Sequence, residues 1–518
     1  MKKKLRLRYD GGITVEREVN YIPIRYILAI LLAIAETAAI LAILILMAKF
    51  IPYFYLMMWS TEIACVITII AADEKPDYKI PWLLIVLVVP VAGFMLYFIF
   101  GSRKLKKKYV RRLDDMRHQT YRSETPALLR QLPPLVRSQA KMLTGIADSN
   151  LFTNTAQRYF PLGEDMHKAL LEDLRTAEKF IFMEYFIIEE GIFWNSILDI
   201  LKEKAAAGVE VRVVYDDIGC MMTLPGNYDE ILKGCGIDAV PFSKLKGNAD
   251  SEFNNRSHRK ITVIDGRVGY TGGVNIADEY INQKELFGHW KDVGLRIEGE
   301  AVRELTKLFL IDYGINVRKL PKPRHDYFPE YSVQEEGYVI PFGDGPVPIY
   351  DRRVGKSVIE NMLQSATRYF YAMTPYLIMD DALCQTVENA ALRGVQVKLI
   401  LPGIPDKWLV KELAKSHYAR LIKAGVEIYE YTPGFVHAKC YQADDETAMV
   451  GTINMDHRSL VHNFENGVWM YKCRCIESIK EDFADTFAKC ERIDESKIHW
   501  NLVQRFIRAA VKVFAPLM

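Results

Sequence analysis

The residues of this chain that are best suited to chemistry form two copies of one short pattern. Each copy begins with a histidine, followed two positions later by a lysine, seven by an aspartate and seventeen by an asparagine. The members are His258, Lys260, Asp265 and Asn275 in the first copy, and His437, Lys439, Asp444 and Asn454 in the second. The two histidines are 179 residues apart, so one chain carries the same four groups twice.

Brought together, the two sets could bind a phosphate and cleave its ester. A neutral imidazole is a competent nucleophile, and a second imidazole that starts protonated can give its proton to the leaving alkoxide. These tasks require the pKa values of the two histidines to differ. We expect each aspartate to hold an imidazole in one tautomer, and the lysines and asparagines to surround the phosphate oxygens. With two ammonium groups present, this chemistry requires no metal.

The segments around the two copies also repeat, which predicts an internal duplication. Each half should contain a helix, a buried strand, a helix that ends at a glycine, and another strand. These segments are 166–177, 179–188, 194–207 and 209–215 in the first half, and 354–366, 368–378, a helix ended by Gly394, and 395–401 in the second. Strands that alternate with helices favour βαβ units and a mostly parallel sheet. The stretch 321–348 is expected to be a linker.

Each histidine leads into a predicted strand, at 261–264 and 440–443, whose return strand follows a turn. A histidine and a lysine two positions apart on a strand face the same side. We therefore expect one imidazole and one ammonium group from each half to face a shared cleft. A single histidine-x-lysine sequence arises often by chance, whereas two copies in matching frames do not.

Three apolar stretches occupy the first hundred residues, at 26–48, 51–72 and 80–100. Each has roughly the 20 residues that cross a hydrocarbon core. Basic clusters at 2–8 and 103–112 flank them, and the positive-inside tendency assigns both clusters to the cytoplasm. Three full spans would separate the clusters, so either the N-terminus is outside or one stretch is re-entrant or interfacial.

Composition narrows the choice of ligands. The net charge is +2, which indicates no polyanionic partner such as nucleic acid. The eight cysteines are scattered without a paired spacing, so we predict neither a disulfide nor a metal site. The last stretch, 500–518, is predicted to be an amphipathic helix that lies on an anionic membrane or packs on the domain.

Three glutamates could assist the site. Glu279 and Glu465 follow the two asparagines, and we expect them to support the motifs by hydrogen bonds. Glu184 lies in an otherwise apolar strand, where a carboxylate is costly unless it is paired. A role facing the site and a structural pair are equally compatible with that position.

The two copies resemble the HKD motifs of the phospholipase D superfamily, and the chain around them resembles bacterial cardiolipin synthases. The stretches that carry the second resemblance are 255–260, 272–280, 290–292, 296–299, 454–459, 463–465 and the apolar 82–101. The resemblance extends from roughly residue 55 to the end of the chain. It implies transphosphatidylation, with phosphatidylglycerol as donor and acceptor, His258 as nucleophile, His437 as acid and base, and no cofactor.

The same resemblance implies an α/β fold with two duplicated phospholipase D-like βαβ sandwich domains that form one shared active-site cleft. An N-terminal helical transmembrane region should precede them. The expected parts are a membrane region with two or three transmembrane helices (1–102), a basic connector (103–150), the two domains (151–325 and 326–499) and the C-terminal helix (500–518). The expected location is a bacterial cell membrane, multi-pass, with the catalytic part in the cytoplasm.

Other functions remain open at this stage. A phosphatidyl hydrolase, or another phosphatidyltransferase of the superfamily, would differ only in whether water or an alcohol accepts the group. A membrane-tethered nuclease is disfavoured by the near-neutral charge and the lack of a long basic stripe. A non-catalytic membrane scaffold is disfavoured because both copies of the pattern are intact.

Overall fold

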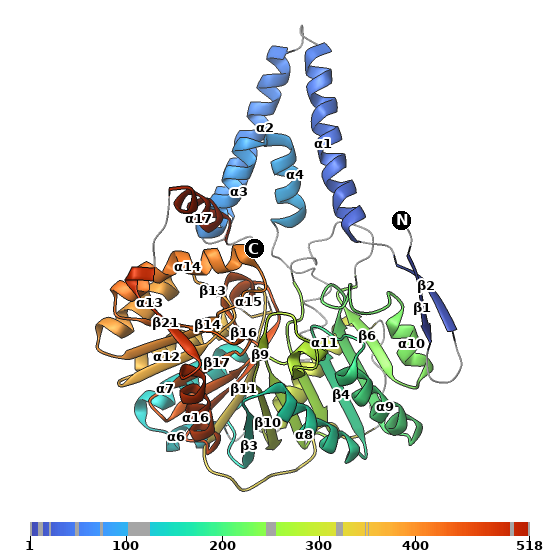
Figure 1. Ribbon diagram of the computed structural model, residues 1–518, viewed down its shortest axis with the longest axis vertical. Helices are drawn as coiled ribbons and strands as arrows, with labels where there is room; N and C mark the ends of the chain where they lie inside the picture. Colours follow the sequence, from blue (N-terminus) through green and yellow to red (C-terminus); the bar gives the residue numbers. More distant parts are fainter. Residues whose placement is uncertain are drawn as a thin grey trace. The chain divides into compact units, whose positions relative to one another are not determined.

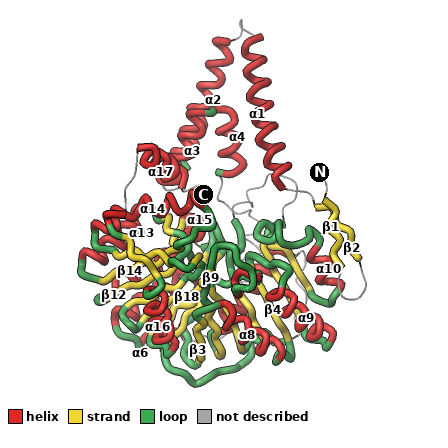
Figure 2. The backbone as a smooth tube through the Cα atoms, in the orientation of Figure 1, coloured by secondary structure: helices red, strands yellow, loops and turns green. Residues whose placement is uncertain are grey.

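The computed structural model shows two compact units, Met1–Gly101 and Ser102–Met518 (Figures 1 and 2). The structure describes residues 3–8, 14–19, 22–46, 51–72, 76–101, 125–244, 255–317, 325–347, 349–350, 352–497 and 502–515. The predicted basic cluster at 103–112 lies outside these residues.

The described residues of the N-terminal unit form a β-hairpin and four helices. The hairpin pairs β1 (Lys3–Arg8) with β2 (Thr14–Val19) in antiparallel register. The helices are α1 (Ile22–Leu46), α2 (Ile51–Ala71), α3 (Pro76–Val88) and α4 (Pro90–Phe100). Among the described residues, one helical segment, Tyr53–Ala71, is long and apolar enough to cross a membrane, and the apolar segment Ile30–Ile43 is shorter.

The third apolar stretch folds as a helical hairpin instead of one long helix. The helix is interrupted at Val89, and Pro90 starts α4, as expected for a residue without an N–H. The rings of Trp82 and Tyr97 lie 5.4 Å apart, and Gly93 sits against the α3 backbone, where a Cβ would lie 2.7 Å from a carbonyl oxygen. At 1.5 Å per residue, neither short helix by itself spans a core about 30 Å thick, which favours two spans over three among the alternatives that the sequence left open.

The second unit is built on two large sheets with the same internal strand order. The first contains β3 (Thr155–Phe160), β10 (Gly294–Gly299), β8 (Val268–Gly272), β7 (Ile261–Ile264), β4 (Phe180–Tyr185), β5 (Glu210–Asp216) and β6 (Asp238–Phe242), in spatial order. The second contains β11 (Tyr338–Asp344), β20 (Glu465–Tyr471), β18 (Thr447–Gly451), β17 (Cys440–Ala443), β12 (Tyr369–Met373), β14 (Gln396–Pro402), β15 (Glu427–Tyr431) and β21 (Cys490–Ile493). The order β10-β8-β7-β4-β5-β6 matches β20-β18-β17-β12-β14-β15, as a duplication requires.

The sheets are mixed, and the prediction of mostly parallel sheets is wrong. In the first sheet only β4, β5 and β6 pair in parallel, and in the second only β12, β14 and β15 do. The other neighbours are antiparallel because each motif strand returns through a tight hairpin, β7 to β8 and β17 to β18. In these two sheets, only the strands that are connected through a crossover helix, β4 to β5 to β6 and β12 to β14 to β15, run parallel.

Helices cover the sheets, so the central strands are buried on both faces. Every residue of β4 and β5 is buried, which explains their continuous apolar runs. The helices are α6 (Thr125–Gln131), α7 (Pro134–Ala147), α8 (Gly163–Arg175), α9 (Ile192–Ala206), α10 (Tyr228–Gly234), α11 (Val302–Asn316), α12 (Val354–Ser365), α13 (Asp381–Leu392), α14 (Trp408–Lys423), α15 (His457–Val461), α16 (Cys475–Phe487) and α17 (Leu502–Phe514). One core cluster contains side chains from both halves, including Phe309 of α11 and Ile359 of α12.

Two further predictions are corrected or decided by the fold. The expected linker contains the strand β11, which pairs with β20 at the sheet edge, where Pro341 is tolerated because it has one strand partner. At the C-terminus, α17 packs on α14, and Arg508 donates to Glu412 over 2.6 Å. Packing on the domain is therefore the alternative that the structure shows.

Candidate active site

The two histidines lie where the halves meet. Each occupies an extended segment immediately before its motif strand, β7 or β17, and not the strand itself. The His258 amide donates to the Phe464 carbonyl over 2.8 Å, and the His437 amide donates to the Lys291 carbonyl over the same distance. Because each histidine segment is hydrogen-bonded to the other half, the backbone itself holds the two imidazoles in one site.

Each imidazole also has a carboxylate from the other half. His258 Nδ1 lies 2.9 Å from Glu465 Oε2, and His437 Nδ1 lies 2.7 Å from Asp292 Oδ2. Burial alone would raise the pKa of both carboxyl groups, but the facing histidines and the lysines keep both below their usual values. An ionised carboxylate that accepts Nδ1–H leaves Nε2 free for chemistry.

The expectation that Asp265 and Asp444 hold the imidazoles is therefore wrong. Asp265 accepts three backbone N–H bonds, each 2.8 Å long, from residues 178–180 at the start of β4. Asp444 accepts the equivalent bonds from residues 367–369 at the start of β12. Seven residues of extended chain span about 20 Å, so an aspartate at this spacing lies at the far end of the strand from its histidine. Both aspartates fasten a hairpin turn to the sheet.

Both motif lysines are buried beside the histidines. Lys260 Nζ donates to the His258 carbonyl over 2.7 Å, and Lys439 Nζ lies 2.8 Å from His437 Nδ1. Burial lowers the pKa of Lys439 to about 8. Burial and the charge of Lys439 lower the pKa of Lys260 well below its usual value. Two ammonium groups that disfavour each other's charge in a dry site are poised to bind an anion.

Among the described residues, no hydrogen bond joins either asparagine to a motif lysine or histidine. Asn275 accepts the Ile187 N–H and donates to the Tyr280 hydroxyl over 2.7 Å. The Tyr280 ring in turn lies 5.3 Å from the His437 ring. Asn454 donates to Asp456 over 2.9 Å. Their observed contacts brace the loops that carry the site.

The three glutamates differ in placement. Glu465 accepts bonds from Ser459 and Thr452 in addition to His258, so it is firmly oriented. Glu184 accepts a 2.5 Å bond from the Ser257 hydroxyl, and burial raises the pKa of Glu184 well above its usual value. Glu279 Oε2 lies 3.9 Å from Lys284 Nζ. Among the described residues, no hydrogen bond joins the Glu279 carboxylate to a residue of either motif.

Sequence reasoning missed the role of Asp292. It appeared only as part of a flanking stretch, although an acidic residue follows His258 by 34 positions and His437 by 28. These two acidic residues, at similar but unequal offsets, are the signal that could have identified Asp292 and Glu465 as a pair. Their contacts depend on the crossing of the two halves, which spacing within one half does not reveal.

The low pKa values of both imidazoles make them neutral at pH 7. Burial lowers the pKa of His258 to about 4, against the opposing charge of Glu465. Burial and Lys439 lower the pKa of His437 to about 3. A phosphodiester anion at about 4 Å stabilises a protonated imidazole by about 4 kcal/mol at an effective dielectric constant of about 20, which is about three pKa units. Binding of an anion can therefore raise the pKa of either imidazole toward the range in which it acts as an acid.

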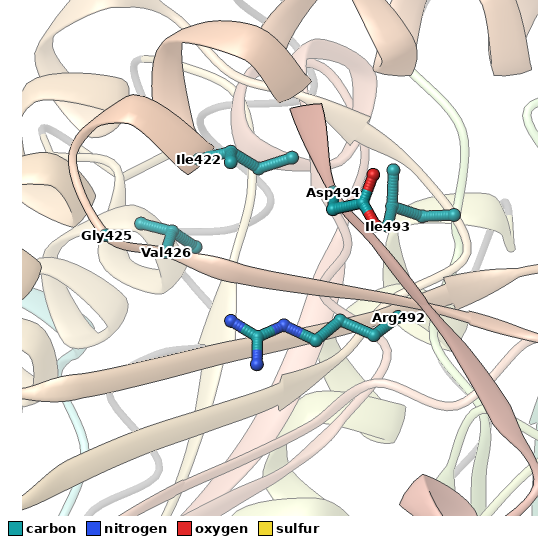
Figure 3. A pocket seen from close by; sticks show the side chains of 6 residues that line it. All are labelled: Ile422, Gly425, Val426, Arg492, Ile493 and Asp494. Atoms are coloured by element: carbon teal, nitrogen blue, oxygen red, sulfur yellow. The ribbon is translucent and has the colours of Figure 1, made fainter. Parts of the chain in front are cut away.

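A separate surface hollow has no part in this arrangement. It has a volume of about 320 Å³ and is lined by Ile422, Gly425, Val426, Arg492, Ile493 and Asp494 (Figure 3). None of these residues belongs to either motif.

Comparison with known families agrees with this geometry. The family described as "Cardiolipin synthase, PLD-like domain" matches residues 170–309 and 359–487, so that each segment contains one motif histidine. A second family, "Phospholipase_D-nuclease N-terminal", matches residues 63–102. The protein belongs to the cardiolipin synthase family. The sequence-based prediction of this family is confirmed.

Relatives within the cardiolipin synthase family match over most of their length. The chain is 32% identical to a cardiolipin synthase of Geobacillus kaustophilus, over 91% of this chain and 95% of that one. It is 32% identical to cardiolipin synthase 2 of Bacillus anthracis, over 88% and 89% of the two chains. An uncharacterized protein of Streptococcus mutans is 40% identical over 85% of this chain and 96% of its own length.

A solved structure supports the fold. The phosphatidylserine synthase of Haemophilus influenzae superimposes with a TM-score of 0.55, over 73% of this chain and 98% of that chain. Its sequence is 15% identical, so the likeness concerns the fold alone. The predicted phospholipase D-like α/β architecture of the cardiolipin synthase family is thus confirmed for the large unit.

Proposed function

We propose that this protein makes cardiolipin from two molecules of phosphatidylglycerol and releases glycerol. The observation that carries the proposal is the crossed pairing of His258 with Glu465 and of His437 with Asp292, beside both buried lysines. This arrangement provides one nucleophile, one proton carrier and a phosphate-binding charge in a chain whose relatives are named cardiolipin synthases.

In the first step, Nε2 of neutral His258 attacks the phosphorus of one phosphatidylglycerol. The bond from phosphorus to the glycerol oxygen breaks, and protonated His437 gives its Nε2 proton to the departing alkoxide. Glu465 accepts the Nδ1 hydrogen bond and balances the positive charge on the phosphorylated imidazole. Lys260 and Lys439 stabilise the equatorial oxygens, so the chain's own ammonium groups do the electrostatic work without a metal.

In the second step, the free primary hydroxyl of another phosphatidylglycerol attacks the same phosphorus. His437, now neutral, takes the hydroxyl proton, and the bond between phosphorus and His258 breaks. Both histidines return to their starting states, and cardiolipin leaves. The mechanism needs an acceptor alcohol in place of water, which separates a synthase from a hydrolase.

The chain is associated with the membrane, and we propose a topology with two spans. At 1.5 Å per residue, α1 and α2 are each longer than a hydrocarbon core. The α3–α4 hairpin then enters and leaves on one side, which puts residues 2–8 and 103–112 together in the cytoplasm. Reporter fusions after residues 20 and 102 should both give cytoplasmic signals, whereas opposite signals would contradict the re-entrant hairpin.

Product analysis tests the proposed activity. Purified full-length protein with phosphatidylglycerol in mixed micelles should give cardiolipin and glycerol in equal amounts, in the presence of excess EDTA. Phosphatidic acid as the sole lipid product would instead identify a hydrolase. Activity that disappears in EDTA and returns with a divalent ion would contradict the metal-free mechanism.

A further inference from the structure

Joining two phosphatidylglycerol molecules brings two phosphates into one site, and the mechanism above accounts for one of them. The acceptor lipid carries its own phosphodiester, which stays intact and is anionic. An anion brought into a partly dry site needs a cation or several donors near it. A cation near the histidines that has no partner among the described residues would meet this need.

Most of the cations at the site are already engaged. Arg256 is ion-paired with Asp216 over 3.0 Å, and Arg259 with Asp312 over 2.6 Å. Lys291 is ion-paired with Asp482 over 2.8 Å. The two motif lysines donate to the carbonyls of their own histidines and face the reacting phosphate.

Arg458 is different. Its side chain is partly buried on the short helix α15. Among the residues that the structure describes, none accepts a hydrogen bond from its guanidinium or forms an ion pair with it. Burial lowers the pKa of Arg458, although a guanidinium stays charged at any physiological pH. A charged group that is partly buried and has no ion-pair partner among the described residues is available to bind an anion.

Arg458 is next in sequence to a residue that is hydrogen-bonded to the carboxylate partner of His258. The next residue, Ser459, donates its hydroxyl to Glu465 over 2.7 Å, and Glu465 is the carboxylate that holds the His258 imidazole. The charges of Asp456, Asp216 and Arg256 act on Arg458. Asp216 also accepts the amide of Ser257, the residue before His258. Arg458 thus lies at the border of the active site, on the side of His258.

The duplication shows that this cation is not part of the repeated framework. Arg458 follows the motif asparagine Asn454 by four positions, and the residue four positions after Asn275 is Glu279. The corresponding positions of the two halves therefore carry opposite charges. A framework residue would be expected in both halves, whereas a group that recognises one particular lipid is needed once.

We propose that Arg458 binds the phosphate of the acceptor phospholipid, and so positions its glycerol hydroxyl for attack on the phosphatidyl-histidine. This inference rests on the proposed function and names the acceptor's recognition group. Arg458 is a positioning residue, because it touches the phosphate that does not react. It should influence the second step with a phospholipid acceptor and leave the first step unchanged.

The test compares acceptors on Arg458→Gln, which removes the charge and keeps most of the side-chain length. With phosphatidylglycerol as acceptor, cardiolipin formation should fall roughly 10- to 100-fold, as expected for a lost charge-assisted bond. Transfer to monooleoylglycerol, which has the same diol and no phosphate, should stay within about twofold. Hydrolysis to phosphatidic acid should also stay within about twofold. Arg458→Lys should retain part of the cardiolipin activity. Arg492→Gln serves as the matched control, because Arg492 is an exposed arginine on strand β21 of the second large sheet.

Each other outcome decides against the inference. An equal loss with all three acceptors would assign Arg458 to the first step or to folding, and unchanged cardiolipin formation would show that it does not bind the acceptor. The amount of acid-trapped phosphatidyl-enzyme in Arg458→Gln should equal or exceed that of the wild type, because the first step is unchanged and the second is slowed. A wild-type protein that makes only phosphatidic acid would overturn the proposed function itself, and this inference with it.

Discussion

The two halves hold their histidines in the same backbone frame but in different surroundings. Three aromatic rings lie near His437: Tyr280 at 5.3 Å, Trp290 at 5.6 Å and Phe435 at 5.9 Å between centroids. In the described part of the chain, one ring lies near His258, that of Phe186 at 5.3 Å. The residue two positions before each histidine shows the contrast most simply, since it is Phe435 in one half and the ion-paired Arg256 in the other.

The duplication gives both histidines the same backbone geometry, whereas the residues substituted around them since then fit the two histidines to different roles. The polar surroundings of His258, with Ser257 bonded to Glu184 and Arg256 to Asp216, suit the group that carries a charged phosphate adduct. The aromatic surroundings of His437 exclude water from the group that passes a proton to and from an alcohol. The contrast supports His258 as nucleophile and His437 as acid and base.

The largest expected effect tests this division directly. His258→Ala and His437→Ala should each lower cardiolipin formation by at least about a thousandfold, because nucleophile and acid are both indispensable. Acid-quenched reactions with labelled phosphatidylglycerol should trap a phosphatidyl-enzyme in His437→Ala and none in His258→Ala. The reverse trapping pattern would exchange the two roles, and substantial activity in either variant would rule out the two-histidine mechanism.

The next effect concerns the two carboxylates. Glu465→Gln and Asp292→Asn should each lower kcat by about 100-fold, since an amide does not stabilise a cationic imidazole as a carboxylate does. Because Glu465 faces the adduct, its variant should also accumulate less trapped phosphatidyl-enzyme, while Asp292→Asn should not. Equal trapping in the two variants would remove the proposed distinction between the halves.

The pH dependence of kcat/KM should reflect the ionisation of Lys439. Burial lowers the pKa of Lys439 to about 8, so Lys439 is charged below that pH and loses its charge as the pH rises through it. The logarithm of kcat/KM should therefore fall with a slope of about −1 above pH 8. Lys439→Arg, which keeps its charge, should move this fall to higher pH. An unchanged profile in that variant would assign the alkaline limb to another group, with Lys260 the next to be tested.

The smallest effect is expected where the halves are alike. Asp265→Asn and Asp444→Asn each weaken a turn that accepts three backbone bonds, so each should destabilise the large unit by about 1–3 kcal/mol. Thermal unfolding followed by circular dichroism should show a midpoint several degrees lower for both. The activity of the folded fraction should stay within a few-fold of the wild type. A hundredfold loss of kcat without destabilisation would restore a catalytic role for the aspartates.

Much of this protein follows from local sequence. The repeated motif, the buried runs at β4 and β12, the hairpins after His258 and His437 and the helix-ending glycines are short-range patterns, which the period of a strand or helix makes readable. The family followed from the same motifs. The feature that was misplaced, strand β11 in the supposed linker, depends on pairing with β20 more than a hundred residues later and has no local signature.

The sequence by itself determined which groups are the candidates for the chemistry: two histidines and two lysines that come in matched sets. Only the tertiary structure decided how they are supported, because the partners of each histidine come from the other half. Glu465 reaches His258 across 207 residues, and Asp292 reaches His437 across 145. Asp265 and Asp444 seemed the natural partners by sequence, but an extended strand carries them away from the histidines that precede them.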